Sequence, residues 1–250
     1  MKPDNAADVA SLWLLRHGQS EGNVIRDAAH ADARAEELDI PLRDMDVGLS
    51  NLGARQAQAF GHWLREVPAN HQPSVVVASP YRRAIDTAAS IVDASGIAAE
   101  IHADERLRER DLGAMDMLTL RGFRSRYPAE AARRDRLGKF YYRPPGGESW
   151  ADVALRCRSA RDSIAREYAG ARVILVTHEV VIIVFRYLLE RLDEHQALAL
   201  SRSQAIGNCS LTTYEQHDGQ LHPEVVQWTL PLQKGDTPVT EEADVRIASR

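Results

Sequence analysis

Short apolar runs alternate along this chain with longer segments of helical periodicity. The runs at 11–15, 75–78 and 172–176 consist mainly of Leu, Ile and Val, which predicts buried strands. Apolar positions recur every three or four residues after Ser50 and again after Ser149, which predicts amphipathic helices. Strands that alternate with helices favour a three-layer α/β/α fold with a mostly parallel central sheet.

Further elements follow from local signals. Ser79-Pro80 combines a capping residue with proline at a first helical position, so we expect a helix to begin there. Residues 180–189 are almost wholly apolar, which predicts a buried helix. Residues 210–215 and 225–229 alternate between apolar and polar positions, which is typical of late strands.

Two long segments lack a clear period. Residues 24–48 are rich in charge, and their length indicates a functional flap with at best one short helix. Residues 104–148 contain much charge, Gly and Pro, and predict an excursion of loops and short helices over one edge of the sheet. We expect one domain over residues 1–250, with a core at about 11–232 and short flexible ends.

Three polar segments directly follow predicted strands. Residues 16–18 follow the first strand, residues 79–83 the second, and residues 177–178 the third. Ligands of open α/β sheets gather outside the carboxyl ends of the strands. We therefore expect these segments, distant in sequence, to converge in space.

The segment after the first strand has the chemistry of an anion site. His17 stands where its ring can face a pocket, and Arg16 beside it supplies a permanent cation for phosphate oxygens. Gly18 allows a tight turn and a close approach to a ligand. Ser20 and Asn23 add neutral hydrogen-bond donors.

Composition narrows the partners. The 250-residue chain has a net charge of −5, which gives no general attraction to nucleic acid or membranes. No apolar run reaches the ~18 residues of a membrane span. The N-terminus lacks the apolar core of a secretory signal, so we expect a cytoplasmic protein. The two cysteines, Cys157 and Cys209, are too few for a disulfide framework.

Six blocks of sequence carry a resemblance to a known family. In chain order they are LLRHGQSEGN (14–23), LSNLGARQA (49–57), SPYRRAIDTA (79–88), LRERDLG (107–113), PGGES (145–149) and VTH (176–178). Together they resemble the histidine phosphatase superfamily, also called the phosphoglycerate mutase-like family, in the order that the family has them. The resemblance implies a phosphoglycerate mutase-like fold in which the excursion at 104–148 covers the active site.

The same resemblance implies a role for each matching residue. His17 resembles the nucleophile that becomes phosphohistidine, and a neutral imidazole is a competent nucleophile near pH 7. Arg16, Arg83 and His178 resemble the cationic cradle that stabilises the charge of a transferring phosphoryl group. Glu109 resembles the general acid that protonates the leaving alkoxide. These roles describe a metal-independent, acid-type phosphatase that needs no cofactor.

Arg82 stands beside Arg83 and competes with it for the cradle position. The family register favours Arg83, because the equivalent Arg directly precedes the Ala three residues before the Thr-Ala pair. Glu179 departs from the family, which commonly has Gly after the second histidine. Its carboxylate can repel the substrate, pair with a cradle Arg or shape substrate choice.

Mutases of the family carry Tyr shortly after the acid and Lys further on, whereas this chain has Leu112 and Leu120. Hydrolysis of phosphate monoesters is therefore favoured. A phosphoglycerate mutase and a catalytically weak phosphate-binding or scaffold protein are the alternatives.

The substrate-binding candidates are Ser20, Asn23, Glu179 and Arg143. Arg143 belongs to the segment GKFYYR, which either lines the mouth of the site or forms a packed loop. Glu148 either contacts the site or anchors its loop. We expect a small phosphorylated substrate of unspecified identity, no nucleic-acid or membrane partner, and a homodimer as one possible assembly.

Overall fold

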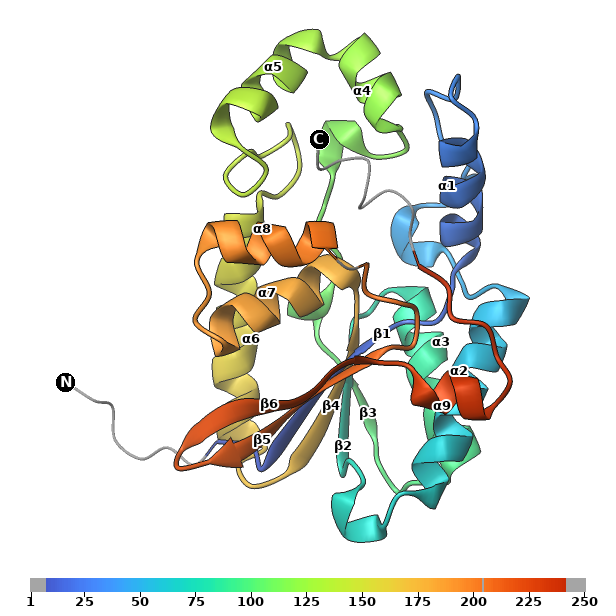
Figure 1. Cartoon of the computed structure of the whole chain (residues 1–250), viewed down its shortest axis with the longest axis vertical. Helices are drawn as coiled ribbons and strands as arrows, with labels where there is room; N and C mark the ends of the chain where they lie inside the picture. The colour runs from blue at the N-terminus through green and yellow to red at the C-terminus, as the bar shows by residue number, and fades with distance from the viewer. Residues whose placement is uncertain (1–7, 204, 242–250) are drawn as a thin grey trace, which may run out of the picture.

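A six-stranded sheet forms the centre of the computed structural model, which describes residues 8–203 and 205–241 (Figure 1). The strands are β1 (Ser11–Arg16), β2 (Val75–Ala78), β3 (Ile101–Ala103), β4 (Arg172–Thr177), β5 (Leu211–His217) and β6 (Gln220–Trp228). Their order is β3-β2-β4-β1-β5-β6. The first four are parallel, and β5 and β6 add an antiparallel edge. The predicted mostly parallel sheet is therefore confirmed.

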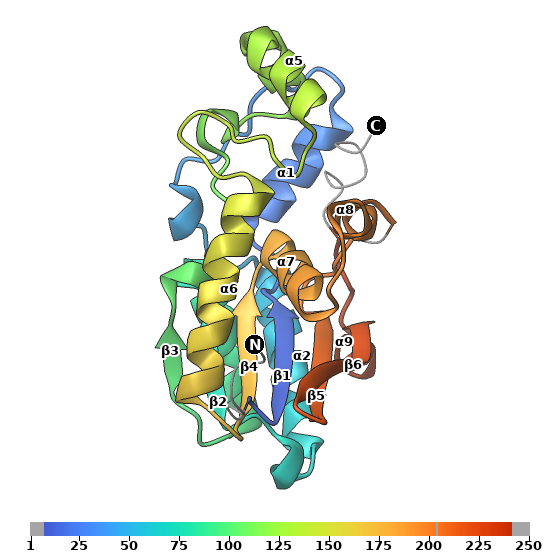
Figure 2. The same cartoon turned by 90° about the vertical axis from the view of Figure 1, so that its left-hand side faces the viewer.

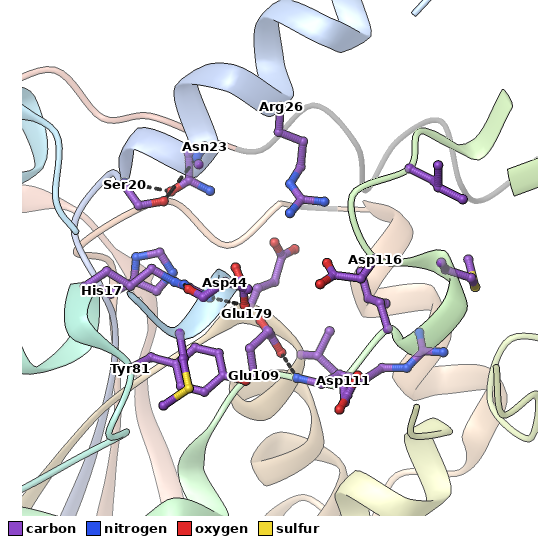
Figure 3. Close-up of a pocket in the computed structure, with 18 of the residues that line it drawn as sticks. His17, Ser20, Asn23, Arg26, Asp44, Tyr81, Glu109, Asp111, Asp116 and Glu179 are labelled. Carbon is purple, nitrogen blue, oxygen red and sulfur yellow. Dashed lines mark hydrogen bonds and ion pairs between the residues drawn. The ribbon is translucent and has the colours of Figure 1, made fainter. Parts of the chain in front are cut away.

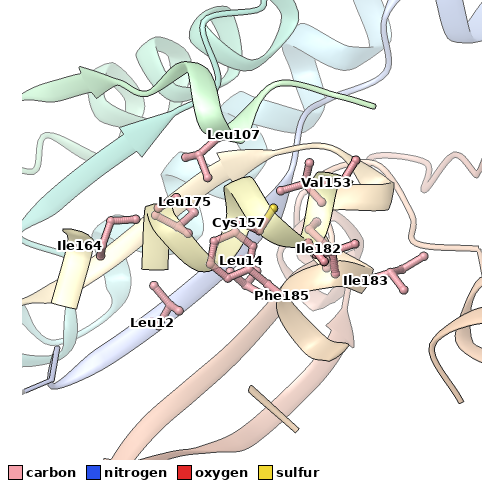
Figure 4. Close-up of a cluster of buried hydrophobic side chains, with 14 of the residues drawn as sticks. Leu12, Leu14, Leu107, Val153, Cys157, Ile164, Leu175, Ile182, Ile183 and Phe185 are labelled. Atoms are coloured by element: carbon pink, nitrogen blue, oxygen red, sulfur yellow. The ribbon is translucent and has the colours of Figure 1, made fainter. Parts of the chain in front are cut away.

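Side chains alternate between the two faces of each strand, and this alternation builds two cores. Leu12 and Leu14 of β1 pack in the cluster with α6 (Trp150–Glu167) and α7 (Glu179–Leu189), as Figure 4 shows. Trp13 and Leu15 pack in the opposite cluster with α2 (Asn51–Glu66) and α3 (Arg82–Ser95). Figure 2 shows α6 and α7 lying across one face of the strands. The three-layer α/β/α arrangement is confirmed.

The apolar run at 180–189 forms α7, as predicted, and Phe185 is completely buried against β1 and α6. Burial of one such side chain contributes about 1.5–3 kcal/mol. Truncation of Phe185 to Ala leaves a cavity and costs about 3–5 kcal/mol. Cys157 of α6 is fully buried in the same core, which makes it a packing residue.

Shorter elements lie around the sheet. They include α1 (Glu21–Ala31), α4 (Leu120–Arg126), α5 (Pro128–Leu137), α8 (Glu194–Ser203), α9 (Leu230–Lys234) and the 3-10 helices η1 (Asp44–Asp46), η2 (Ala69–His71), η3 (Glu105–Leu107) and η4 (Gly113–Met115). Figure 1 shows α1, α4 and α5 above the sheet, on the side to which the parallel strands point. Among the described residues, none of the helices combines the length and apolar character required to cross a bilayer.

Helix starts differ from the sequence expectation in two places. Ser149 caps α6 as predicted, with Asp152 completing a capping box. By contrast, α3 begins at Arg82 and not at Ser79, and its N-cap residue makes no side-chain hydrogen bond. Residues 24–48 were expected to be irregular with at best one short helix. They include most of the eleven-residue α1, which starts from a capping box between Ser20 and Asn23.

The polar stretch after Gln233 is also more ordered than expected. The N–H of Asn208 donates to the carbonyl of Thr240 at 2.8 Å, and Gln56 Nε2 donates to the carbonyl of Pro238 at 2.9 Å. Residues 237–241 therefore run as a strap against α2 and the loop before β5. Most of the ends that we expected to be flexible, residues 1–7 and 242–250, lie outside the described residues.

Candidate active site

The turn after β1 is fixed by its neighbours. The N–H of His17 donates to the carbonyl of Thr177 at 2.9 Å, which continues the pairing of β1 with β4. The N–H of Gly18 donates to Thr87 Oγ1 at 3.0 Å. A Cβ on Gly18 would lie 2.5 Å from the carbonyl oxygen of Gly53, so only glycine permits this approach of α2.

The rings of His17 and His178 meet at this edge of the sheet. Their centroids are 5.1 Å apart with an interplanar angle of 62°, and the two residues are 3% and 0% exposed. The strands that precede them are adjacent and parallel, which brings two residues far apart in the chain to one place. The structure thus assembles the pair that the strand ends indicated.

The hydrogen bond of His17 fixes its tautomer. Nδ1 lies 2.7 Å from the carbonyl oxygen of Gly18, which can only accept, so Nδ1 carries the proton. The lone pair is then on Nε2. Burial, followed by the charges of Arg83 and Arg16, holds the pKa of His17 well below 6.5. The imidazole is therefore neutral and nucleophilic at neutral pH.

His178 is oriented by a residue that the sequence analysis treated as a helix cap. Ser79 Oγ lies 2.8 Å from His178 Nε2, which ties the ring to the end of β2. His178 Nδ1 is buried and has no hydrogen-bond partner among the described residues. Burial and the charge of Arg83 also hold the pKa of His178 well below 6.5. Nδ1 is thus the ring nitrogen whose hydrogen-bonding capacity is unused among the described residues.

Two buried arginines at this edge of the sheet, Arg16 and Arg83, each pair with a carboxylate. Arg16 lies 3.6 Å from Glu179, and its Nη1 also contacts the carbonyl of Ile206. Arg83 Nη1 donates to the backbone carbonyl of Asp44 at 2.6 Å, and its Nη2 donates to the carboxylate of Asp44 at 3.0 Å. Glu179 thus pairs with a cradle arginine, one of the options that its position left open.

The two adjacent arginines of α3 have different surroundings. Arg83 is 5% exposed and faces the rings, with its guanidinium 5.0 Å from the ring centroid of Tyr81. Arg82 has a side chain that is 66% exposed and lies 3.5 Å from Asp86. The structure therefore brings Arg83, and not Arg82, to the histidines.

Glu109 lies on a loop that is held in place by hydrogen bonds of Glu148 and Arg156. Glu148 accepts hydrogen bonds from Arg108 at 2.6 Å and from Arg156 at 2.9 Å. Arg156 also donates to the backbone carbonyl of Glu109 at 3.2 Å. Burial acts to raise the pKa of Glu148, but the hydrogen bonds from Arg156 and from the N–H of Asp111 outweigh it and lower that pKa. Glu148 therefore anchors the loop.

A cavity of about 380 Å³ opens above the histidines (Figure 3). Its size suits a small ligand. The sequence-predicted residues that line it are Arg16, His17, Ser20, Asn23, Arg83, Glu109 and Glu179. His178 lies beneath this lining, in contact with His17. Figure 3 shows Glu109, Asp44 and Glu179 around the same space as His17.

Arg143 stands apart from the other site candidates. It is absent from the described residues that line the cavity, and its exposed guanidinium pairs with Asp152 at the start of α6. The ion pair places the guanidinium of Arg143 outside the lining of the cavity, away from the other substrate-binding candidates. Lys139 of the same segment does line the cavity.

Ser20 and Asn23 line the cavity but also bond to each other. The N–H of Asn23 donates to Ser20 Oγ at 3.1 Å, and the N–H of Ser20 donates to Asn23 Oδ1 at 2.9 Å. The Ser-x-x-Asn spacing was a readable start signal for α1. Their capping role positions the wall of the cavity.

Two further residues were missed by the sequence analysis. Asn208 Nδ2 donates to the carbonyl of His17 at 3.0 Å, and so supports the backbone of His17. Asp44 reaches Arg83 from the charge-rich segment between α1 and α2. Neither residue lies in one of the six resembling blocks. Within residues 8–203 and 205–241, no group of three or more His, Cys, Asp and Glu side chains is placed to hold a metal ion.

Comparisons with known proteins agree with this geometry. The sequence profile described as Histidine phosphatase superfamily (branch 1) matches residues 12–230. Glucosyl-3-phosphoglycerate phosphatase of Mycobacterium tuberculosis is 29% identical over 245 residues, which cover 92% of this chain and 97% of that protein. A bifunctional protein of the same organism is 35% identical over 173 residues, and the match covers 67% of this chain but only 40% of that longer protein.

Solved structures give the same result. The mycobacterial glucosyl-3-phosphoglycerate phosphatase in complex with VO3 superposes with a TM-score of 0.65 at 30% identity, covering 87% of this chain and 98% of that one. A phosphoglycerate mutase of Bacillus anthracis superposes with a TM-score of 0.69 at 20% identity, covering 93% and 99%, which shows a shared fold. With two buried histidines and two buried arginines at the strand ends that the family profile spans, this chain belongs to the histidine phosphatase superfamily.

Proposed function

We propose that this protein hydrolyses phosphate monoesters through a phosphohistidine on His17, with Glu109 as the proton donor. The observation that carries the proposal is the state of His17. Its ring is neutral, its proton is held on Nδ1 by Gly18, and it lies in a cavity with two buried arginines. Nε2 is thereby prepared to attack phosphorus, and cations stand ready for the phosphoryl oxygens.

The first half-reaction moves the phosphoryl group to the enzyme. Nε2 of His17 forms a bond to phosphorus as the bond between phosphorus and the ester oxygen breaks. Glu109, in its protonated form, gives its proton to the departing alkoxide. The imidazole becomes positively charged, and the carbonyl of Gly18 stabilises that charge through the bond to Nδ1.

The second half-reaction releases phosphate. Water attacks phosphorus, and the ionised Glu109 accepts the proton of the water. The bond between phosphorus and Nε2 breaks, its electrons return to the imidazole, and His17 is neutral again. Arg16, Arg83 and His178 stabilise the charge on the equatorial oxygens in both steps, and no metal step enters the proposal.

The cavity favours hydrolysis over isomerisation. Leu112 and Leu120 line it at the positions where the mutases that the sequence resembles carry polar groups. An apolar wall there offers no partner to a second acidic group of a phosphoglycerate at these two points. The phosphatase relatives support the same choice.

We further propose a small phosphorylated metabolite as the substrate class. The cavity of about 380 Å³ suits a molecule of that size. Glucosyl-3-phosphoglycerate is the first compound to test, because relatives that cover most of this chain are phosphatases named for it.

Three measurements on the purified protein test the proposal. Release of phosphate from p-nitrophenyl phosphate and from glucosyl-3-phosphoglycerate is compared with interconversion of phosphoglycerates. We expect hydrolysis without interconversion, and His17→Ala should abolish it and prevent labelling of the protein by a ³²P substrate. His62→Ala, at an exposed position of α2, is the control. Full turnover by His17→Ala, or interconversion without hydrolysis, would contradict the proposal.

A further inference from the structure

Asp44 makes a two-point contact with a residue that the proposed reaction needs. It belongs to η1, and both its backbone carbonyl and its carboxylate bind the guanidinium of Arg83, at 2.6 Å and 3.0 Å. Asp44 is 39 residues away from Arg83 in the sequence. The contact therefore results from the fold and not from local chain geometry.

The carboxylate of Asp44 uses the same donors that a phosphoryl group would use. A guanidinium holds its N–H groups in one plane and can donate them either to a carboxylate or to a phosphate. Both residues line the cavity that contains His17. A phosphate that takes the Nη2 N–H now bound to Asp44 must displace that carboxylate, and a phosphate on the other Nη2 N–H lies beside its negative charge.

The second arginine of the cradle shows what distinguishes Asp44. Arg16 also lies beside a carboxylate, but the side chain of Glu179 is 5% exposed and stands on the first residue of α7. The side chain of Asp44 is 32% exposed. Water can solvate Asp44 when it leaves Arg83, whereas the side chain of Glu179 is almost wholly buried.

We propose that Asp44 is an internal competitor for the phosphate-binding side of Arg83, and that it determines selectivity for esters over free phosphate. An ester gains contacts from its organic part in the cavity and can displace the carboxylate. Inorganic phosphate lacks those contacts and binds weakly, which favours release of the product. The selectivity between ester and product rests on the proposed function, but the competition for Arg83 does not.

Direct binding of inorganic phosphate tests the competition. Asp44→Asn removes the charge and keeps the backbone carbonyl that holds Arg83. By calorimetry at fixed ionic strength, we expect inorganic phosphate to bind Asp44→Asn about tenfold more tightly than the unchanged protein, because one like charge next to the anion is gone. Asp44→Ala should act in the same direction, since it also keeps the backbone carbonyl.

Asp86→Asn is the matched control. Asp86 lies one turn after Arg83 in α3 and pairs with Arg82 at 3.5 Å, and both residues are absent from the described residues that line the cavity. The variant removes the same amount of charge from the region without freeing an arginine of the cavity. We expect its affinity for inorganic phosphate to change less than twofold.

Kinetics give a second measurement and separate the two proposals. If the protein is a phosphatase, Asp44→Asn should lower the KM for p-nitrophenyl phosphate and strengthen inhibition by phosphate by a similar factor. Tighter phosphate binding in a protein without turnover would keep Asp44 as competitor and reject the proposed function. Turnover together with unchanged or weaker phosphate binding in both Asp44 variants would reject the competitor alone. Equal tightening in Asp86→Asn would also reject it.

Discussion

Ser79 and His178 lie 99 residues apart in the chain and form a hydrogen bond of 2.8 Å between Oγ and Nε2. The bond joins the end of β2 to the end of β4, two strands that pair in parallel. It holds the buried ring of His178 in one orientation, with Nδ1 as the nitrogen that has no partner among the described residues. Ser79 is therefore a positioning residue for the imidazole of His178.

Loss of this hydrogen bond should reduce turnover while the fold remains intact. Ser79→Ala frees His178 to rotate, so we expect kcat for phosphomonoesters to fall about tenfold, which corresponds to about 1.4 kcal/mol of transition-state stabilisation. Ser79→Thr, which restores a hydroxyl, should recover part of the rate. Steady-state kinetics check this, with the exposed Ser74→Ala as control. Unchanged kcat in Ser79→Ala would show that the bond does not position the ring.

Glu109 should matter most for substrates with poor leaving groups. Glu109→Gln cannot donate a proton, so we expect kcat for an alkyl phosphate to fall by roughly 10²–10⁴. The contrast between substrates should appear in kcat/KM, which reports on transfer to His17. For p-nitrophenyl phosphate kcat/KM should fall much less than for the alkyl phosphate, because p-nitrophenolate departs without protonation. Asp111→Asn, which removes an exposed carboxylate at the cavity two residues further on, is the control. An equal loss on both substrates would argue that Glu109 acts otherwise.

Removal of Glu148, which anchors the Glu109 loop, should lower the free energy of unfolding. Glu148→Ala leaves the guanidiniums of Arg108 and Arg156 without their acceptor, and the side chains of Glu148 and Arg156 are 14% and 10% exposed. We expect the free energy of unfolding to fall by about 1–3 kcal/mol. Urea unfolding measures it. Asp135→Ala, which removes an exposed carboxylate that pairs with Arg124, should change it by less than about 1 kcal/mol. Equal effects of the two variants would exclude the anchor.

The buried histidines should make stability depend on pH. The pKa of His17 is held well below 6.5, so the folded state binds fewer protons than the unfolded state in mild acid. The contribution is complete above about pH 6.5 and is lost as pH falls towards the lowered folded-state pKa. The slope is up to about 1.4 kcal/mol per pH unit for each such histidine.

Urea unfolding at several pH values between 7.5 and 5 tests that slope. In His17→Gln the free energy of unfolding should depend less steeply on pH than in the unchanged protein. His195 has a side chain that is 86% exposed, so His195→Gln should leave the slope as it was. A slope that His17→Gln does not alter would mean that the folded protein protonates His17 as readily as the unfolded chain does.

Sequence alone predicts the parts of this molecule that depend on local signals. The apolar run of β1, the apolar run of α7 and the cap at Ser149 each specify an element within a few residues. The meeting of His17 and His178 follows from a general rule of parallel sheets, and needs no contact to be known beforehand.

The remainder depends on contacts between distant segments. Asp44 lies in a charge-rich stretch where one carboxylate resembles the next, and only the fold brings this one to Arg83. Arg143 lies outside the lining of the cavity and pairs with Asp152, a contact that the sequence pattern does not encode. The residues around Ser79 predict a helix cap. Its hydrogen bond to His178 joins distant segments, so the neighbouring sequence does not indicate it.

The strap at residues 237–241 has a practical consequence for handling this protein. Thr240 Oγ1 donates to Asn208 Oδ1 at 2.9 Å, and Asn208 in turn donates to the carbonyl of His17. Substitution or removal of residues 237–241 would therefore disturb a segment that is two hydrogen bonds from the backbone of His17. A change at Asp8, beside the start of β1, lies a full strand length away from His17.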